Sequence, residues 1–168
     1  MMDAFIQQHF KGKHFDKDSV IALKGNINNE LLFALKDNAF FKQALPKTTG
    51  PELFNLDYLQ QAKEKSLTTM LSVEDTMATL NKFSADTIID ALLKTISKDV
   101  SIKIYASGGG MHNPLLMQHI KAALPNCEFL TTADLDIEPD AKEAVLFAVL
   151  ANECICGDGS YLQKGNLS

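Results

Sequence analysis

Three successive glycines, Gly108, Gly109 and Gly110, stand in the stretch ASGGGMHNP, between an expected strand and an expected helix. Residues without a Cβ let backbone N–H groups approach a phosphate, a ribose or a flat base closely. In α/β folds ligands bind at the carboxyl ends of strands, which is where this turn lies. Together with the flanking Ser107 and Asn113, the glycines are therefore candidate nucleotide-binding residues.

The glycine turn also has a purely structural interpretation. Its spacing matches neither G-x-G-x-x-G nor G-x-x-x-x-G-K-[ST], so neither a Rossmann fingerprint nor a P-loop is indicated. A tight turn that packs a helix against a strand would use glycines equally well. Asn113 before Pro114 is good chemistry for a helix start, with Asn113 as the cap and no ligand needed. The local pattern leaves both interpretations open.

A second candidate is the run Lys47-Thr48-Thr49-Gly50, which lies between two expected helices. A lysine beside two hydroxyl groups can bind an anionic or hydroxyl-rich ligand. The alternative is a capping box formed by Thr49 and Glu52, with Lys47 in solvent.

Glu143 is a third candidate, because it opens the segment AKEAVLFAVLANECI, which is apolar on nearly every face. Such a helix is expected to be buried on several sides, so its carboxylate must reach water or find partners. Glu143 could accept hydrogen bonds from sugar hydroxyls. Alternatively, it interacts favourably with the positive N-terminal end of its own helix.

The remaining histidine, cysteine and acidic residues predict neither a metal site nor a catalytic nucleophile. One group matches no common metal-ligand spacing and is expected in surface loops: His9, His14, Asp16 and Asp18. Cys154-x-Cys156 lacks a second pair, and His112 and His119 have no evident carboxylate partner. No Ser-His-Asp grouping can be assembled, so no catalytic residue and no metal ligand is assigned.

The elements that must position these residues follow from capping residues and hydrophobic periodicity. Helices are expected over 3–10, 28–36, 56–65, 72–96, 113–124 and 139–155, and strands over 102–106 and 127–130. In the longest helix Val73, Met77, Leu80, Ile88 and Leu92 predict one face turned to a core, with Thr and Asp on the other side. The order predicts an α/β fold with a helix-rich first half and a sheet mainly in the second half.

Composition sets limits on the class of protein. The 168 residues, 46% hydrophobic and 22% charged, suit one soluble globular domain. A net charge of -5 argues against a nucleic-acid partner, and no apolar run is long enough to span a membrane. Three irregularly spaced cysteines argue against a disulfide framework and predict a cytoplasmic location.

Four stretches, in the same order, resemble anhydro-N-acetylmuramic acid kinase: MDAFIQQH, PKTTGPELFN, SGGGMHNPLLMQHI and PDAKEAVLFAVLA. The resemblance covers essentially the whole chain and is to the C-terminal half of the proteins in that family. It implies that residues 1–168 form a single ribonuclease-H-like domain on the nucleotide side, with the N-terminal domain absent. The family uses ATP and water to open the 1,6-anhydro ring of anhydro-N-acetylmuramic acid. The product is N-acetylmuramic acid 6-phosphate, in cell-wall recycling.

The same resemblance assigns roles to the candidates. It implies that the three glycines lie against the adenosine part of ATP, that Glu143 faces the sugar, and that Lys47, Thr48 and Thr49 lie near the cleft. The family's phosphate loops and its general-base aspartate are missing, so Mg²⁺ would be held mainly by the absent half. The isolated chain is therefore expected to be inactive. Pro51 stands where family members have a basic residue, which departs from the pattern.

Two other functional hypotheses remain beside this resemblance. One is a non-catalytic nucleotide-binding or interaction module that keeps the glycine turn without the chemistry. The other, an unrelated α/β hydrolase, is disfavoured because no nucleophile elbow is present. Half of a two-domain kinase should expose the apolar surface that its partner domain covers, so a homodimer is expected.

Overall fold

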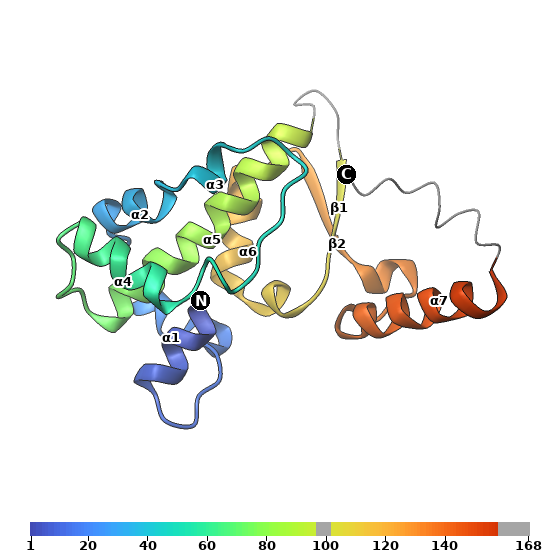
Figure 1. Ribbon diagram of the computed structural model, residues 1–168, viewed down its shortest axis with the longest axis horizontal. Coiled ribbons are helices and arrows are strands. Elements are labelled where there is room, and N and C mark those ends of the chain that lie inside the picture. The colour runs from blue at the N-terminus through green and yellow to red at the C-terminus, as the bar shows by residue number, and fades with distance from the viewer. Residues whose placement is uncertain (97–101, 158–168) are drawn as a thin grey trace.

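The chain is mostly helical before its sheet begins (Figure 1). The computed structural model describes residues 1–96 and 102–157. The main elements are α1 (Met2–His9), α2 (Asn29–Lys36), α3 (Ala39–Lys42), α4 (Leu56–Lys65), α5 (Val73–Thr95), β1 (Ile102–Ala106), α6 (Pro114–Ala123), β2 (Cys127–Thr131) and α7 (Lys142–Cys156). This order confirms a mixed α/β chain with a helix-rich first half.

The sheet formed by the described residues has two parallel strands, joined by a crossover through α6. Ile102 of β1 pairs with Cys127 of β2, and Ala106 pairs with Thr131. Along β1 the residues alternate between half-buried and exposed, as the period of two predicted. The carboxyl end of β1 runs directly into the glycine turn, so this short sheet positions the turn.

Short polar residues cap the beginnings of α2 and α5, as the sequence predicted. The side chain of Asn28 accepts the N–H of Leu31 at 2.8 Å and caps α2. The Ser72 hydroxyl accepts the N–H of Asp75 at 3.0 Å and caps α5. Each cap satisfies a backbone donor that has no partner within the helix, which is why these residue types mark the starts.

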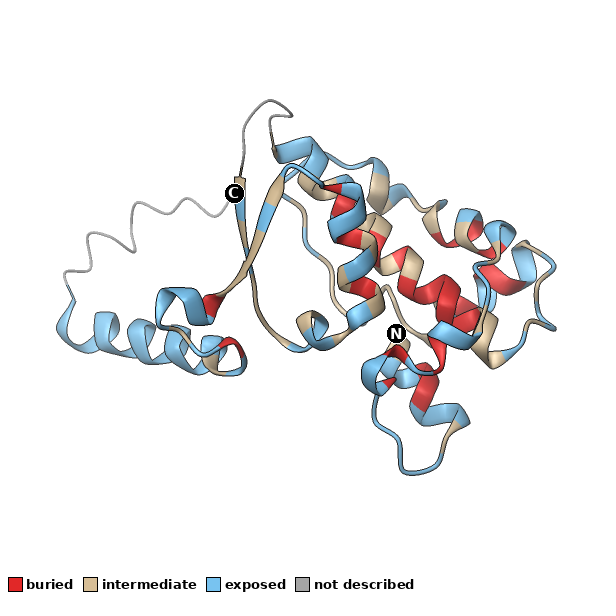
Figure 2. Cartoon of the chain, turned by 180° about the vertical axis from the view of Figure 1, so that it is seen from behind, coloured by how far each residue is buried: buried red, intermediate tan, exposed pale blue. Residues whose placement is uncertain are grey.

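Helix α5 supports two hydrophobic clusters (Figure 2). Its first half contributes Met77, Leu80 and Phe83 to a cluster with α1, α2 and α4. Its second half contributes Ala85 and Ile89 to a smaller cluster with α6. The second cluster holds α6 in place, and thereby the end of the glycine turn.

One prediction about α5 is wrong. Thr76 and Thr79 are fully buried rather than solvent-facing, and Ile89 is buried while Ile88 is 40% exposed. The reason is that neighbouring segments cover α5 on more than one side, so a single apolar stripe does not describe it. The buried Thr79 hydroxyl is satisfied by two hydrogen bonds. It donates to the carbonyl of Asp75 at 2.7 Å and accepts the N–H of Asn28 at 2.9 Å.

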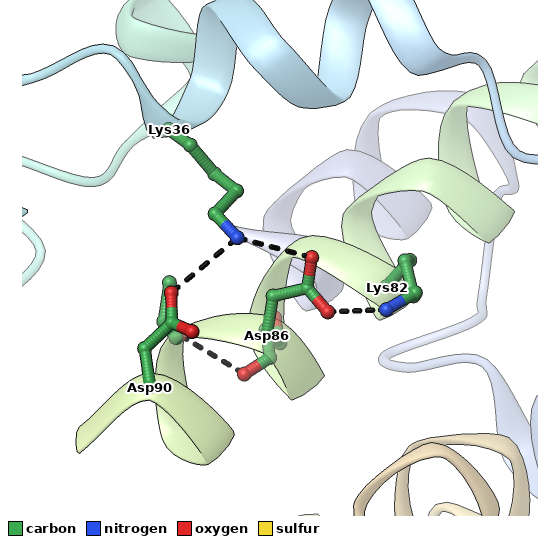
Figure 3. Close-up of polar contacts among 6 residues, drawn as sticks. Lys36, Lys82, Asp86 and Asp90 are labelled. Atoms are coloured by element: carbon green, nitrogen blue, oxygen red, sulfur yellow. Dashed lines mark hydrogen bonds and ion pairs between the residues drawn. The ribbon is translucent and has the colours of Figure 1, made fainter. Parts of the chain in front are cut away.

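A cluster of charged side chains joins α2 to α5 (Figure 3). Lys36 Nζ lies 3.2 Å from Asp86 and 3.3 Å from Asp90, and Lys82 also donates to Asp86. Burial alone would raise the pKa of Asp86, but hydrogen bonds from Lys82 and Lys36 outweigh it and lower that pKa. Nearby, burial and the charge of Lys82 lower the pKa of His119.

Helix α7 also departs from its prediction, because every residue from Lys142 to Cys156 is exposed (Figures 1 and 2). Phe147 is 68% exposed and Ile155 is 82% exposed. The segment is apolar, but among the described residues its main packing contact is with the adjoining turn Pro139–Ala141, which leaves its apolar side chains uncovered. In residues 1–96 and 102–157 no helix combines the length and the apolar character needed to cross a membrane.

Candidate functional site

The centre of the glycine turn has a left-handed backbone conformation and open space where a side chain would stand. Gly108 has φ +79°, a backbone conformation that residues with side chains rarely adopt. A Cβ built on Gly109 would meet no described atom within 4 Å, and one on Gly110 would meet only Leu116 at 3.6 Å. Tight packing of helix on strand therefore explains Gly109 poorly. The space where a side chain of residue 109 would stand is available to a ligand.

A cavity of about 620 Å³ lies against this turn. Gly109, Gly110 and Asn113 line one side of it. The 15–18 loop, which precedes the 3₁₀ turn Ala22–Lys24, lines another side, with Met77 of α5 among the other lining residues. The cavity thus brings together segments that lie about a hundred positions apart in the sequence.

The second wall of the cavity was not predicted from the sequence. Asp16, expected on the surface, is buried and accepts the N–H groups of Ile21 and Ala22, each at 2.9 Å. Asp18 and Ser19 both adopt left-handed backbone conformations, with φ of 56° and 58°. Such a conformation costs a residue with a side chain about 1–2 kcal/mol. The run of turn-forming residues around Asp18 was the only signal for this loop.

Asn113 does more than the predicted helix cap. Its Oδ1 accepts the N–H of Leu116 at 2.9 Å, which is the cap itself. The same oxygen accepts hydrogen bonds from Ser19 Oγ at 2.7 Å and from Asn81 Nδ2 at 2.9 Å. Ser19 and Asn81 are fully buried. Asn113 therefore joins Ser19, which follows the 15–18 loop, to helix α5 and helix α6 at the edge of the cavity.

The candidate residues Lys47 and Thr49 line a second cavity of about 670 Å³, which shares the lining residues Met2 and Asp3 with the cavity beside the glycine turn. Its wall includes the aromatic rings of Phe40, Phe41, Phe54 and Phe83. Lys47 is half-buried rather than solvated: its Nζ donates to the carbonyl of Phe40 at 2.7 Å and lies 4.5 Å from the centre of that ring. Thr48 is exposed and is not among the lining residues.

The alternative of a capping box at Thr49 is wrong. Glu52 accepts the N–H of Gly50 at 2.7 Å, and its own segment is a turn rather than a helix. The following helix begins only at Leu56, where Asn55 accepts the N–H of Tyr58 at 3.0 Å. Asn55 is a better cap because it directly precedes the first helical residue.

Glu143 lies in the first turn of α7 and is exposed. The structure brings Gly109, Gly110 and Asn113 together, but it places Lys47 and Thr49 in another cavity and Glu143 on the outlying helix. The sequence-predicted site residues therefore lie in two adjoining cavities and on α7. Ser107 and Gly108 are half-buried next to the turn.

His112 has a carboxylate partner that the sequence did not reveal. Its Nε2 lies 3.1 Å from Asp140 Oδ1, which links the end of the glycine turn to the segment before α7. Both side chains are more than half exposed, so the pair is a weak, screened contact. Across residues 1–96 and 102–157, no three histidine, cysteine or acidic side chains lie close enough to hold a metal ion.

Residues 1–164 match the family model described as anhydro-N-acetylmuramic acid kinase. The proteins of that name from Pseudoalteromonas atlantica and Pseudoalteromonas translucida are 52% and 50% identical to this chain, over 158 and 165 residues. The one from Caldanaerobacter subterraneus is 35% identical over 166 residues. These matches cover 94–98% of this chain but 39–42% of the relatives, so the chain spans about two fifths of their length.

Proposed function

The chain belongs to the anhydro-N-acetylmuramic acid kinase family, and from that premise we propose that it forms the ATP-binding part of such a kinase. In the proposed reaction, water opens the 1,6-anhydro ring of 1,6-anhydro-N-acetylmuramic acid and the phosphoryl group of ATP passes to O6, which gives N-acetylmuramic acid 6-phosphate and ADP. The chain would be the C-terminal, ribonuclease-H-like domain of the enzyme. The parallel β1–α6–β2 unit is consistent with that fold.

The open space at Gly109 is the observation that carries this proposal. The glycine turn follows the carboxyl end of β1, and a cavity of about 620 Å³ lies against it. A flat adenine ring or a ribose fits against a backbone that carries no Cβ, and no described atom lies within 4 Å of the place where a Cβ of Gly109 would stand. When bound, ATP supplies the phosphoryl group. This chain's residues would contribute the wall for its nucleoside part.

In the described residues no three histidine, cysteine or acidic side chains lie close enough to hold a metal ion by themselves. Mg²⁺ at a nucleotide site is held by one or two carboxylates together with the phosphates. We propose that the phosphates, the metal ion and the attacking water are positioned mainly by the part of the kinase that this chain does not span. We propose that the isolated chain binds nucleotide without catalysing the reaction.

The other assigned residues are proposed to contact the sugar from outside the nucleotide cavity. Glu143 is exposed on α7 and is free to accept hydrogen bonds from hydroxyl groups of a ligand held by another domain. Lys47 and Thr49, with the exposed Thr48 beside them, present an ammonium and hydroxyl groups at the aromatic cavity. These groups suit a sugar acid, which carries both hydroxyls and a carboxylate.

The exposed apolar residues of α7 support a macromolecular partner for this domain. Val145, Leu146 and Phe147 are each at least 40% exposed along one helix. We propose that the remaining part of the kinase covers them, and that the isolated chain forms a homodimer instead.

Calorimetric titration with ATP tests the nucleotide site. The parent chain is compared with Gly109→Ala and Gly109→Val, which add one and three carbons where there is open space. Both variants should keep the parental melting temperature. ATP affinity should fall slightly in Gly109→Ala and by at least about tenfold in Gly109→Val, because the added carbons occupy space that the ligand needs. Unchanged affinity in Gly109→Val would show that ATP does not lie against this turn.

A coupled assay with ATP, Mg²⁺ and anhydro-N-acetylmuramic acid tests the proposed inactivity. No turnover is expected from the 168-residue chain alone. Turnover at this length would refute the view that catalytic groups lie elsewhere. ATP binding that stays unproductive when the rest of a related kinase is supplied would favour the non-catalytic module.

A further inference from the structure

Asn113 receives more hydrogen bonds than a helix cap requires. The N–H of Leu116 alone satisfies the capping role, at 2.9 Å. Two side chains from distant segments donate to the same Oδ1: Ser19 at 2.7 Å and Asn81 at 2.9 Å. Ser19 Oγ in turn lies 3.3 Å from the N–H of Leu115 and can accept from it. The helix start after the glycine turn is therefore fixed from two sides.

Both donors occupy positions that are costly unless the hydrogen bonds are made. Asn81 is fully buried on α5, and a buried amide without a partner would destabilise the fold. Ser19 is also fully buried and has a left-handed backbone, as does the preceding Asp18. The buried carboxylate of Asp16 stabilises this loop by accepting the N–H groups of Ile21 and Ala22. Strained backbone of this kind is concentrated at functional sites.

The hydrogen bond from Ser19 to Asn113 lies at the edge of the cavity beside the glycine turn, where Asn113 lines the wall and the buried Ser19 follows the lining segment. The segment before Ser19, Phe15 to Asp18, lines one wall, and Gly109, Gly110 and Asn113 line another. Asn113 also donates its backbone N–H to the carbonyl of Gly110 at 3.2 Å, so its position sets the end of the turn. Ser19 thus joins the two walls directly.

We propose that Ser19 is a positioning residue for the nucleotide site. Through Asn113, and with Asn81 as the supporting donor, it fixes the glycine turn at a set distance from the 15–18 loop. A flat nucleoside base would then enter a preorganised slot, which reduces the ordering cost of binding. This inference rests on the proposed nucleotide site. It adds that the Ser19 hydroxyl determines the distance between the two walls of that site.

Amide hydrogen exchange, followed by NMR in the chain without ligand, tests the positioning role. Ser19→Ala removes the hydroxyl, and Ser19→Gly removes it while relieving the left-handed backbone, so Ser19→Gly offers a folded variant if alanine destabilises. The amides of Met111 and Asn113 close the turn by donating to Gly108 and Gly110. Both variants should exchange these two amides at least about tenfold faster than the parent.

Ser66→Ala is the control, because it also removes a serine hydroxyl that donates an internal hydrogen bond, to the carbonyl of Ala62 at 2.7 Å, and Ser66 does not line the cavity. It should leave the two turn amides within about twofold of the parent. If neither Ser19 variant speeds their exchange beyond this control, the positioning role is wrong.

ATP titration of the same variants separates this inference from the proposed function. Loss of the hydroxyl should weaken ATP binding by at least about tenfold, while Ser66→Ala binds like the parent. A parent chain that does not bind ATP overturns the proposed nucleotide site, and hydrogen exchange then decides the positioning of the turn on its own. A looser turn with unchanged ATP affinity overturns the role of Ser19 in nucleotide binding.

Discussion

Replacing Asp86 with asparagine should remove the charge that holds α2 against α5. Asp86 accepts hydrogen bonds from Lys36 and Lys82, and its side chain is 15% exposed, against 35% and 30% for the two lysines (Figure 3). Asparagine preserves the shape but leaves two ammonium groups close together without their shared carboxylate. The isosteric change therefore isolates the electrostatic contribution.

The expected loss follows from this partial burial. Exposed ion pairs contribute about 0.2–1 kcal/mol, whereas breaking a buried pair costs about 3–5 kcal/mol. Asp86 lies between these limits, so Asp86→Asn should destabilise the fold by about 2 kcal/mol, which lowers the melting temperature by about 4–8 °C. Asp90→Asn is the control. Its carboxylate is 55% exposed and, within the described residues, forms an ion pair only with Lys36, so its loss should stay below about 0.5 kcal/mol.

The pH dependence gives this prediction a second test. The pKa of Asp86 is lowered from 3.8, so its contribution is fully present above 3.8 and is lost as the pH falls through the lowered value. Burial opposes the charge of Lys36, but Asp86 and Asp90 outweigh it and raise its pKa from 10.5. That contribution is therefore lost only as the pH rises through the raised value.

Urea unfolding of the parent and the two variants should therefore show a constant difference from about pH 5 to 9 that shrinks in strong acid. Equal losses for Asp86→Asn and Asp90→Asn, or a difference that does not change in acid, would refute the reasoning.

Three further predictions concern other parts of the fold. Gly25→Ala should destabilise by about 2–3 kcal/mol in urea unfolding, because its Cβ would lie 2.1 Å from the carbonyl oxygen of Glu74; a loss under about 0.5 kcal/mol would contradict that close approach. Lys63 is only 9% exposed, lies 5.5 Å from the ring of Phe5, and has its pKa lowered from 10.5 by burial. Lys63→Met should therefore stabilise by about 0.5–1 kcal/mol at pH 7, and the gain should vanish above the pH at which the lysine loses its charge in the unfolded chain. Phe147→Ser should reduce self-association in light scattering without changing the melting temperature, since Phe147 is 68% exposed; a clear drop in melting temperature would show that the side chain is packed.

Helix positions were predictable because the information is local. Asn28, Ser72 and Asn113 each cap the helix that was expected to begin there, and the alternation in β1 was visible in five residues. A cap acts on backbone groups two or three positions away, so residue type and spacing suffice to place it. The glycine turn at the end of β1 was predictable for the same reason.

The second wall of the cavity was not predictable from local pattern. The hydrogen bond from Ser19 to Asn113 spans 94 positions, and left-handed backbone at Asp18 has no reliable signature in residues other than glycine. Burial of Thr79 likewise depends on a partner far away in sequence, the N–H of Asn28. Periodicity identifies apolar faces, but it cannot tell which polar groups will find partners inside.

Helix α5 contributes residues to both hydrophobic clusters and therefore couples their stability. Its 23 residues extend about 35 Å at 1.5 Å per residue, and each half belongs to a different cluster. Loss of packing around α6 would leave the second half of α5 unsupported, while the first half keeps its contacts with α1, α2 and α4. Partial unfolding should therefore begin at the sheet and advance along α5 toward its N-terminal half. The candidate nucleotide cavity would be lost in that first step, well before the helical cluster melts.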